Sequence, residues 1–334
     1  MKAIGFTTSF DLNETNAFEE RDLPIPTATG NDLLVKVKAA SINPVDTKSR
    51  NTSDGTFKIL GYDGVGVVEA VGEDVELFHV GDEVYYSGTN TRQGSNAEYQ
   101  LVDERIVGLK PEFLSYAEAA ALPLTALTAF EALNEGLGIS TNPEENEGKT
   151  LLIINGAGGV GSIATQIAKE LGLTVITTAS RKETRRWSEK MGANIVLNHK
   201  HNLPDELKAH KIDAVDYIFN THSSDAYFDV MAEIIKPRGS IVALVNFMDK
   251  VNLNLLKDKS VTFSFEFMFT RPKYETDDMI MHHEYLRKLT YLLDRGTLKT
   301  TLYKKLNGLS VETITEAHRL IEQGNSIGKI VIEY

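Results

Sequence analysis

The feature that most constrains this fold is a glycine-rich segment, INGAGGVGS at residues 154–162, which ends the apolar run LLII. Gly156, Gly158 and Gly161 fit the pattern G-x-G-x-x-G between a predicted strand and a predicted helix, with a second predicted strand about twenty residues further on. The first glycine allows a tight turn, the second lets backbone N–H groups reach a pyrophosphate, and the third lets helix and strand pack closely. The segment, including Gly159 and Val160, therefore predicts a dinucleotide-binding turn at a helix N-terminus.

The pattern of apolar residues changes along the chain. Roughly the first 120 residues read as short strands separated by turn residues, such as LLVKVKAASI at 33–42 and GVGVVEAVG at 64–72. Residues 115–133 carry apolar side chains three and four apart, which is helical spacing. From Thr150 onward, predicted strands and helices alternate, which indicates βαβ units and a doubly wound parallel sheet. We expect an α/β protein in which a β-rich part precedes this sheet.

The residues after the second strand of the βαβ unit indicate which dinucleotide binds. An NAD site normally places Asp or Glu there to bond the ribose 2′-hydroxyl. This chain instead has Ser180, Arg181 and Lys182 in the segment TTASRKETRR. Because a planar guanidinium suits a phosphate dianion, these residues favour NADPH over NADH. Arg185 and Arg186 are expected on the solvated face of the next helix.

Composition excludes several other classes of protein. The chain of 334 residues has no cysteine, which excludes disulfides, thiolate nucleophiles and cysteine-ligated zinc. Its formal net charge of -12 disfavours binding to nucleic acid or to anionic membranes. The sequence has no apolar window of membrane-spanning length, and its first residues, MKAIGFTTSF, lack the apolar block of a signal peptide. We expect a cytoplasmic protein with no nucleic-acid or membrane partner.

Several further motifs together resemble the medium-chain dehydrogenase/reductases over essentially the whole chain. They are SINPVDTKSR at 41–50, LGYDGVGVVEAVG at 60–72, GDEV at 81–84, GSNAEYQLV at 94–102, ALPLTALTAFEAL at 121–133, NGAGGVGS, MGANIVLNHK at 191–200 and GKIVI at 328–332. Within that superfamily the chain is similar to the quinone oxidoreductase branch and to bacterial zinc-type alcohol dehydrogenase-like proteins.

This resemblance implies a domain organisation. A discontinuous GroES-like catalytic domain would cover 1–124 and 268–334, a Rossmann NADPH-binding domain would cover 125–267, and a cleft would lie between them. It also implies a homodimer formed through an edge strand of the Rossmann sheet, near the segment VTFSFEF.

The resemblance raises the question of zinc, and the residue types at the matching positions speak against it. The positions of the catalytic zinc ligands in zinc alcohol dehydrogenases are here Asn43 and the pair Tyr62-Asp63, and the position of the proton-relaying hydroxyl is Val45. The histidines do not replace these ligands. The two that are nearest in sequence, His282 and His283, are adjacent on a predicted helix and cannot share one face. We therefore expect no zinc.

Without a Lewis acid, oxidation of an unactivated alcohol is difficult, whereas hydride delivery to an already electrophilic acceptor is not. The sequence therefore favours an NADPH-dependent, zinc-independent reductase of a quinone or an α,β-unsaturated carbonyl, whose partner is a small electrophilic acceptor. Three alternatives stay open: a 2-enoyl-thioester reductase, a non-catalytic NADPH-binding redox sensor and an RNA-binding role, the last of which the charge disfavours.

Candidate catalytic residues follow from the same resemblance. Asn43 is expected either to polarise an acceptor oxygen or to form a turn before Pro44, and Asp46 to order that loop rather than act as an acid. Tyr62 is expected either to hydrogen-bond the acceptor oxygen or to be a buried tyrosine with a satisfied hydroxyl. Candidate substrate contacts are Tyr86 and Arg92, although a solvated loop is the alternative for Arg92.

The resemblance also implies cofactor contacts beyond the glycine turn. The polar residues and strand tips in the matching regions are the serious candidates, because apolar residues in such strands belong mostly to the core. Besides the turn and residues 180–182, the candidate cofactor contacts are Asn220, Thr221, Val245, Phe267, Phe269 and Lys329. The single tryptophan, Trp187, is expected to pack rather than to stack on adenine.

Overall fold

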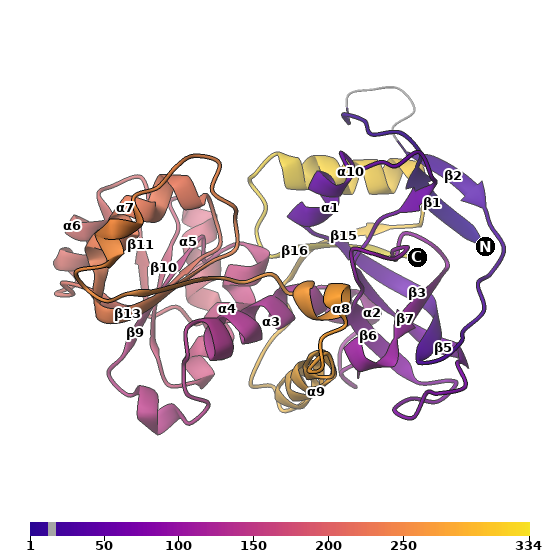
Figure 1. The fold of residues 1–334 in the computed structure, drawn as a ribbon, viewed down its shortest axis with the longest axis horizontal. Helices are drawn as coiled ribbons and strands as arrows, with labels where there is room; N and C mark the ends of the chain where they lie inside the picture. The colour runs from indigo at the N-terminus through magenta and orange to yellow at the C-terminus, as the bar shows by residue number, and fades with distance from the viewer. Residues whose placement is uncertain (13–17) are drawn as a thin grey trace. The chain divides into compact units, whose positions relative to one another are not determined.

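A computed structural model describes residues 1–12 and 18–334 of the chain (Figure 1). Contacts divide the chain into two compact units, Met1–Leu127 with Phe269–Tyr334, and Thr128–Met268. The boundaries expected from the sequence lay at residues 124/125 and 267/268, within three residues of these. The discontinuous unit runs from indigo to magenta and returns from orange at α8 to yellow in Figure 1, and the other unit runs from pink to orange.

The discontinuous unit is rich in β-strands. A seven-stranded sheet has the order β15-β16-β3-β5-β6-β8, with β7 paired to β3, and a three-stranded sheet has the order β2-β1-β4. The strands are β1 (Lys2–Phe6), β2 (Glu19–Asp22), β3 (Asp32–Ile42), β4 (Lys58–Ile59), β5 (Asp63–Val71), β6 (Glu83–Ser87), β7 (Tyr99–Asp103), β8 (Val107–Leu109), β15 (Leu302–Asn307) and β16 (Lys329–Glu333). The helices are α1 (Pro44–Ser49), η1 (Glu104–Ile106), α2 (Tyr116–Ala120), the first part of α3 (Pro123–Phe130), α8 (Thr270–Tyr274), α9 (Met281–Asp294) and α10 (Val311–Glu322).

The register of three neighbouring strands brings distant residues together. Strand β16 is antiparallel to β3, with Ile330 opposite Ile42, and β5 is antiparallel to β3, with Asp63 opposite Ser41. The end of β3 therefore lies between the beginnings of β16 and β5. Lys329, the first residue of β16, is placed beside Ser41 and Asp63 although it is far from both in sequence.

The second unit has the predicted parallel sheet. Its six strands are all parallel, in the order β11-β10-β9-β12-β13-β14. They are β9 (Thr150–Ile154), β10 (Thr174–Thr178), β11 (Ile195–Leu197), β12 (Val215–Asn220), β13 (Ile235–Ala243) and β14 (Thr262–Phe265). The helices are η2 (Glu131–Gly136), η3 (Pro143–Asn146), α4 (Gly159–Glu170), α5 (Lys182–Lys190), α6 (Leu203–Ala209), α7 (Ser224–Ile234) and η4 (Leu253–Leu256). The sequential order reverses between β9 and β12, and ligands bind such sheets at this switch point.

The core of this second unit follows from its strand sequences. Leu152, Ile176 and Ile218 on the central strands are 0% exposed and pack with Phe228 of α7. Because helices cover both faces of a parallel sheet, such strands are apolar on both sides, as the run LLII is. The predicted α/β fold class is confirmed.

The helical spacing over residues 115–133 produces two helices rather than one. Helix α2 ends at Ala120, and α3 begins at Pro123, which lacks the N–H group that a continuous helix would need at that position. Helix α3 then continues into a wider helical turn over Glu131–Gly136. In the part of the chain that the structure describes, none of the helices has the length and apolar character needed to cross a membrane.

Candidate functional site

The glycine-rich turn connects β9 to helix α4, and its glycines are required by close packing. A Cβ atom added to Gly156 would lie 2.4 Å from Cβ of Thr177 on β10, and one added to Gly161 would lie 2.4 Å from the carbonyl oxygen of Asn155. Asn155 itself adopts a left-handed conformation with φ of 69°. Gly158 is the residue before α4 and has no side chain that could accept from the helix. The first N–H groups of α4 are therefore available to an anion.

The neighbouring strand tip offers a polar group beside this turn. Asn220 ends β12 opposite Ile154 of β9, at the switch point of the sheet, and is 0% exposed. Its Oδ1 accepts a hydrogen bond from the N–H of His222 at 3.1 Å. Within residues 1–12 and 18–334, its Nδ2 has no hydrogen-bond partner. Because a buried donor without a partner is costly, this amide fits a ligand bound over the turn. Thr221 beside it donates to the carbonyl of Ile154 at 2.8 Å.

The residues predicted to select the dinucleotide follow β10. Ser180 is half-buried, and Arg181 and Lys182 are exposed at the start of α5. The backbone of Arg181 is fixed by Thr184, whose hydroxyl accepts from its N–H at 3.2 Å and donates to its carbonyl at 2.9 Å. Two cationic residues therefore stand at the tip of β10, next to the strand that carries the glycine turn.

The remaining cofactor candidates are divided between the two units. Val245 follows β13 and Phe267 follows β14, so both belong to the unit that has the glycine turn, and Phe267 is 47% exposed. Phe269 and Lys329 belong to the other unit. There Phe269 packs on the ring of Tyr62, with ring centres 4.8 Å apart. Trp187 packs α5 against α4, and its Nε1 donates to the hydroxyl of Ser162 at 2.8 Å.

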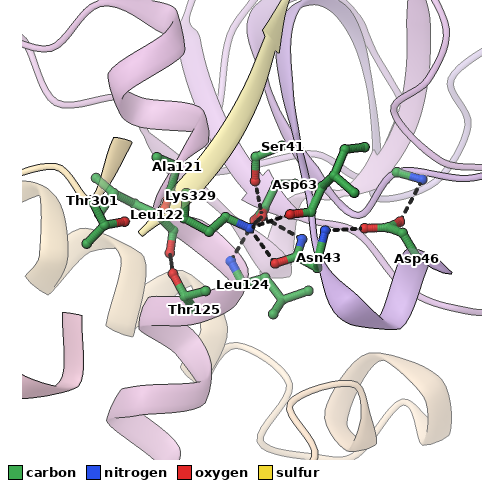
Figure 2. Close-up of polar contacts among 12 residues, drawn as sticks. Ser41, Asn43, Asp46, Asp63, Ala121, Leu122, Leu124, Thr125, Thr301 and Lys329 are labelled. Atoms are coloured by element: carbon green, nitrogen blue, oxygen red, sulfur yellow. Dashed lines mark hydrogen bonds and ion pairs between the residues drawn. The ribbon is translucent and has the colours of Figure 1, made fainter. Parts of the chain in front are cut away.

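A second polar cluster is buried in the discontinuous unit, where the end of β3 meets the beginnings of β5 and β16 (Figure 2). Its members are Ser41, Asn43, Asp63 and Lys329, and we call them the Asn43 cluster. None of the four side chains is more than 3% exposed. Asp63 Oδ2 accepts from Ser41 Oγ at 2.5 Å, from Asn43 Nδ2 at 2.8 Å and from Lys329 Nζ at 3.1 Å. Asp63 Oδ1 accepts from the N–H of Leu124 at 2.7 Å, in the first turn of α3. The carboxylate is thus fully supplied with donors.

The ammonium of Lys329 is equally well supplied with acceptors. Besides Asp63, it donates to Asn43 Oδ1 and to the carbonyl oxygen of Ile42, the latter at 3.2 Å. Three donors therefore meet three oxygen atoms. A buried ion pair of this kind is tolerated only when such hydrogen bonds compensate the loss of hydration.

Asp46 and Tyr62 flank this cluster. Asp46 is 0% exposed, and its carboxylate accepts from the N–H groups of Asn43 at 2.7 Å and of Gly61 at 3.1 Å, which ties helix α1 to the segment before β5. Burial raises the pKa of Asp46 to about 7. The hydroxyl of Tyr62 lies 2.9 Å from Ser49 Oγ. Burial also raises the pKa of Tyr62, to about 12, so this phenol stays protonated at neutral pH.

The two predicted substrate contacts lie in different surroundings. Tyr86 is 0% exposed and belongs to a hydrophobic cluster with Val35 and Val84. Arg92 makes two hydrogen bonds of 2.7 Å to the carboxylate of Asp32 and lines two surface hollows. Among the described residues, the hydroxyl of Tyr86 has no hydrogen-bond partner, and the side-chain hydrogen bonds of Arg92 go to Asp32 rather than to the Asn43 cluster.

The residues of this cluster do not fit a zinc ion. Two oxygen atoms that face the middle of the cluster, Asn43 Oδ1 and Asp63 Oδ2, already bind the ammonium of Lys329. A divalent cation at the same oxygens would lie beside this fixed positive charge, without a thiolate or an imidazole ligand. Elsewhere in the described ranges 1–12 and 18–334, no group of His, Cys, Asp or Glu gathers in a way that can hold a metal.

Sequence reasoning missed the role of Ser41 and Asp63. From the sequence, Asp63 was considered only because its position matches a residue of the zinc site in zinc alcohol dehydrogenases. A carboxylate at the start of an apolar strand, DGVGVV, is itself a signal of a buried partner. The identity of that partner was not available from the sequence, because Lys329 lies 266 residues away.

Comparison with known families and proteins agrees with the two-domain fold, although some of the matching names refer to zinc. Residues 29–130 match the alcohol dehydrogenase GroES-like domain, and residues 159–280 match the zinc-binding dehydrogenase domain. The chain is 53% identical to a zinc-type alcohol dehydrogenase-like protein of Staphylococcus epidermidis over 99% of both chains. It is 32% identical to 2-methylene-furan-3-one reductase of Solanum lycopersicum, over 99% of this chain and 79% of the relative. It is also 30% identical to the chloroplastic NADPH-dependent alkenal/one oxidoreductase of Arabidopsis thaliana, over 94% of this chain and 75% of the relative.

Solved structures give the same result. A candidate zinc-dependent alcohol dehydrogenase of Rhizobium etli CFN 42 is 43% identical, with a TM-score of 0.95 over 100% of this chain and 98% of that one. The quinone oxidoreductase of Coxiella burnetii is 30% identical, with a TM-score of 0.82 over 100% and 99% of the two chains. With a GroES-like and a Rossmann domain, this chain belongs to the medium-chain dehydrogenase/reductase family and is an oxidoreductase of that family.

Proposed function

We propose that the protein is a zinc-independent, NADPH-dependent reductase of a quinone or an α,β-unsaturated carbonyl. The observation that carries the proposal is the Asn43 cluster, in which Asn43 and Asp63, two of the three residues at positions that match the zinc site, bind a lysine ammonium. Among the relatives, a furanone reductase, an NADPH-dependent alkenal/one oxidoreductase and a quinone oxidoreductase carry names of this chemistry. All three names describe reduction of conjugated carbonyl compounds.

The residues of the second unit fit NADPH. The uncapped N-terminus of α4 would hold the pyrophosphate, and the buried amide of Asn220 would donate to the part of the cofactor that lies over the turn. Ser180, Arg181 and Lys182 would hold the 2′-phosphate. When bound, the reduced nicotinamide supplies the hydride. The role of the protein is then to orient the acceptor and to stabilise negative charge on its oxygen.

Asn43 is the group that we propose for stabilising this charge. Its Nδ2 carries two hydrogens, and one of them is donated to Asp63 Oδ2. Among the described residues, no acceptor binds the other hydrogen. Asn43 is 1% exposed, so water does not compete for this donor, and the acceptor has to reach the amide past the side chains that cover it. Tyr62 is a protonated phenol at neutral pH and is the second candidate donor. Asp46 positions Asn43, because its carboxyl group accepts a hydrogen bond from the backbone N–H of Asn43.

The test is NADPH consumption by metal-free protein with phenanthrenequinone, benzoquinone and an alkenal, each compared with NADH and with added zinc. We expect turnover that prefers NADPH and is indifferent to zinc. The variant Asn43→Ala should lower kcat about a hundredfold if the amide stabilises the acceptor oxygen. Asn202→Ala is a control, because Asn202 likewise stands directly before a helix, where its side chain accepts from the N–H of Asp205 at 3.0 Å, but it is exposed and lies in the other unit.

Three results would contradict the proposal. NADPH binding without turnover of any acceptor would favour a redox sensor. Activity confined to enoyl thioesters would favour an enoyl-thioester reductase. Activity that depends on added zinc would show that the interpretation of the Asn43 cluster is wrong.

A further inference from the structure

The contacts of Lys329 define the orientation of the Asn43 amide. An ammonium group can only donate hydrogen bonds, and an ionised carboxylate can only accept them. The amide of Asn43 touches both, with Oδ1 against Lys329 Nζ and Nδ2 at 2.8 Å from Asp63 Oδ2. Rotating the amide by half a turn would place its NH2 group against the ammonium and its oxygen against the carboxylate. Both contacts would then be repulsive, so the ion pair permits one orientation.

The same contacts leave Lys329 without a hydrogen for another ligand. Its three N–H groups are directed to Ile42 O, Asn43 Oδ1 and Asp63 Oδ2, and the side chain is 3% exposed. A cofactor phosphate bound by Lys329 would have to replace one of these oxygens and would disrupt the pair with Asp63. The geometry is that of a residue directed toward Asn43.

We propose that Lys329 is a positioning residue for Asn43, held in place by Asp63. It fixes the amide so that the second hydrogen of Nδ2 is presented to the acceptor, and it polarises the amide through Oδ1. An amide whose oxygen accepts a charge-assisted hydrogen bond becomes a stronger donor at its nitrogen. This role rests on the proposed function, because it requires an acceptor oxygen that binds Asn43.

The ion pair adds this polarisation without adding net charge. Asp63 balances the charge of Lys329, and Ser41 and the N–H of Leu124 complete the coordination of the carboxylate. The cluster therefore contains a cation fixed by covalent attachment to β16, rather than one that has to be bound from solution. Its position is set by the pairing of β16 with β3.

The experiment is a kinetic double-mutant cycle with Lys329→Met and Asn43→Ala, in which kcat and the Kd for NADPH are measured for each protein. Lys329→Met keeps the length of the side chain and removes its charge. We expect Lys329→Met to lower kcat about tenfold to a hundredfold and to change the Kd for NADPH less than about twofold. In the Asn43→Ala background the same substitution should change kcat less than about twofold, because its effect passes through the amide.

Lys305→Met is the control. Lys305 is on β15 of the same sheet and is paired with Glu333 of β16 at 2.6 Å, but it is 45% exposed. Its loss should leave kcat and the Kd for NADPH unchanged.

Two further variants keep the test decisive if Lys329→Met is poorly folded because Asp63 loses its partner. The double variant Asp63→Asn with Lys329→Met removes both charges and should raise the melting temperature relative to Lys329→Met without restoring kcat. Lys329→Arg keeps the charge that Asp63 requires and should be more stable than Lys329→Met, but its planar fork cannot meet the same three oxygens, so it should lose part of kcat.

The outcomes separate this role from the proposed function. Wild-type protein without turnover of any acceptor would refute the proposed function and this role together. An active wild type whose Lys329→Met variant binds NADPH at least about tenfold more weakly, with kcat unchanged at saturation, would refute only this role and show a cofactor contact. Equal losses of kcat in both Asn43 backgrounds would also refute it.

Discussion

The buried carboxyl of Asp46 predicts that stability depends on pH in an unusual direction. Its pKa is raised by burial from 3.8 to about 7 in the folded protein, and the side chain is 0% exposed. Between these two values the folded protein holds a proton on Asp46 that the unfolded chain has lost. Because stability falls with pH wherever the folded state binds more protons, this group destabilises the fold as pH rises from about 4 to about 7.

The magnitude follows from the size of the shift. Each pKa unit corresponds to about 1.4 kcal/mol, so raising the pH from 5 to 7 should lower the free energy of unfolding by on the order of 3 kcal/mol through Asp46 alone. Above pH 7 the folded protein also loses this proton, and the effect levels off. The prediction applies to the difference between wild type and Asp46→Asn, since other groups titrate equally in both proteins.

The assay is urea unfolding of wild type and Asp46→Asn at several pH values between 5 and 8. The variant should be less stable by about 1–3 kcal/mol at pH 5, because both oxygens of Asp46 face backbone N–H groups, whereas the NH2 group of an asparagine would place a donor against one of these donors. The wild-type advantage should shrink as pH rises. An advantage that stays constant or grows with pH would refute the reasoning and show that Asp46 is ionised in the folded protein.

Three other predictions follow from particular residues. Arg181→Ala should raise KM for NADPH about tenfold and leave KM for NADH nearly unchanged, as measured by initial rates, and an equal effect on both cofactors would contradict a 2′-phosphate contact. Gly156→Ala should abolish NADPH binding in a fluorescence titration and lower the melting temperature, because the added Cβ would lie 2.4 Å from Cβ of Thr177; near-native binding would show that the turn adapts. We also propose a homodimer that pairs through the edge strand β14, where Phe265 is 57% exposed; Phe265→Lys should give monomers in light scattering, whereas Phe113→Lys, at a 75% exposed position, should not.

The dinucleotide turn was predictable because its signal is local. The run LLII, the spaced glycines and the following helix lie within about twenty residues, and each glycine answers a steric requirement of the same turn. The structure shows that requirement at Gly156 and Gly161. The alternation of strands and helices likewise determined the α/β fold class, because a parallel strand needs a crossover helix. The family resemblance was confirmed by domain matches over residues 29–130 and 159–280.

The polar cluster was only partly predictable. The sequence singled out Asn43 and Asp46 within one short motif, and the structure joins them, because Asp46 accepts from the N–H of Asn43 within the first turn of α1. Tyr62 was expected either to bind the acceptor oxygen or to be a buried tyrosine with a satisfied hydroxyl. In the structure its hydroxyl pairs with Ser49, the last residue of helix α1. Lys329 was expected to contact the cofactor. Its engagement with Asn43 and Asp63 depends on which strands are neighbours, a property that local patterns do not encode.

By itself the sequence determined the class of fold, the position of the dinucleotide turn, the cationic residues after β10 and the lack of cysteine ligands. Only the tertiary structure decided what takes the place of those ligands. Strands β16 and β3 pair across almost the whole length of the chain, and this pairing brings Lys329 to Asp63 over a separation of 266 residues. A buried lysine and a buried aspartate are each unfavourable alone, and they are stable here because the sheet register places each at hydrogen-bonding distance from the other.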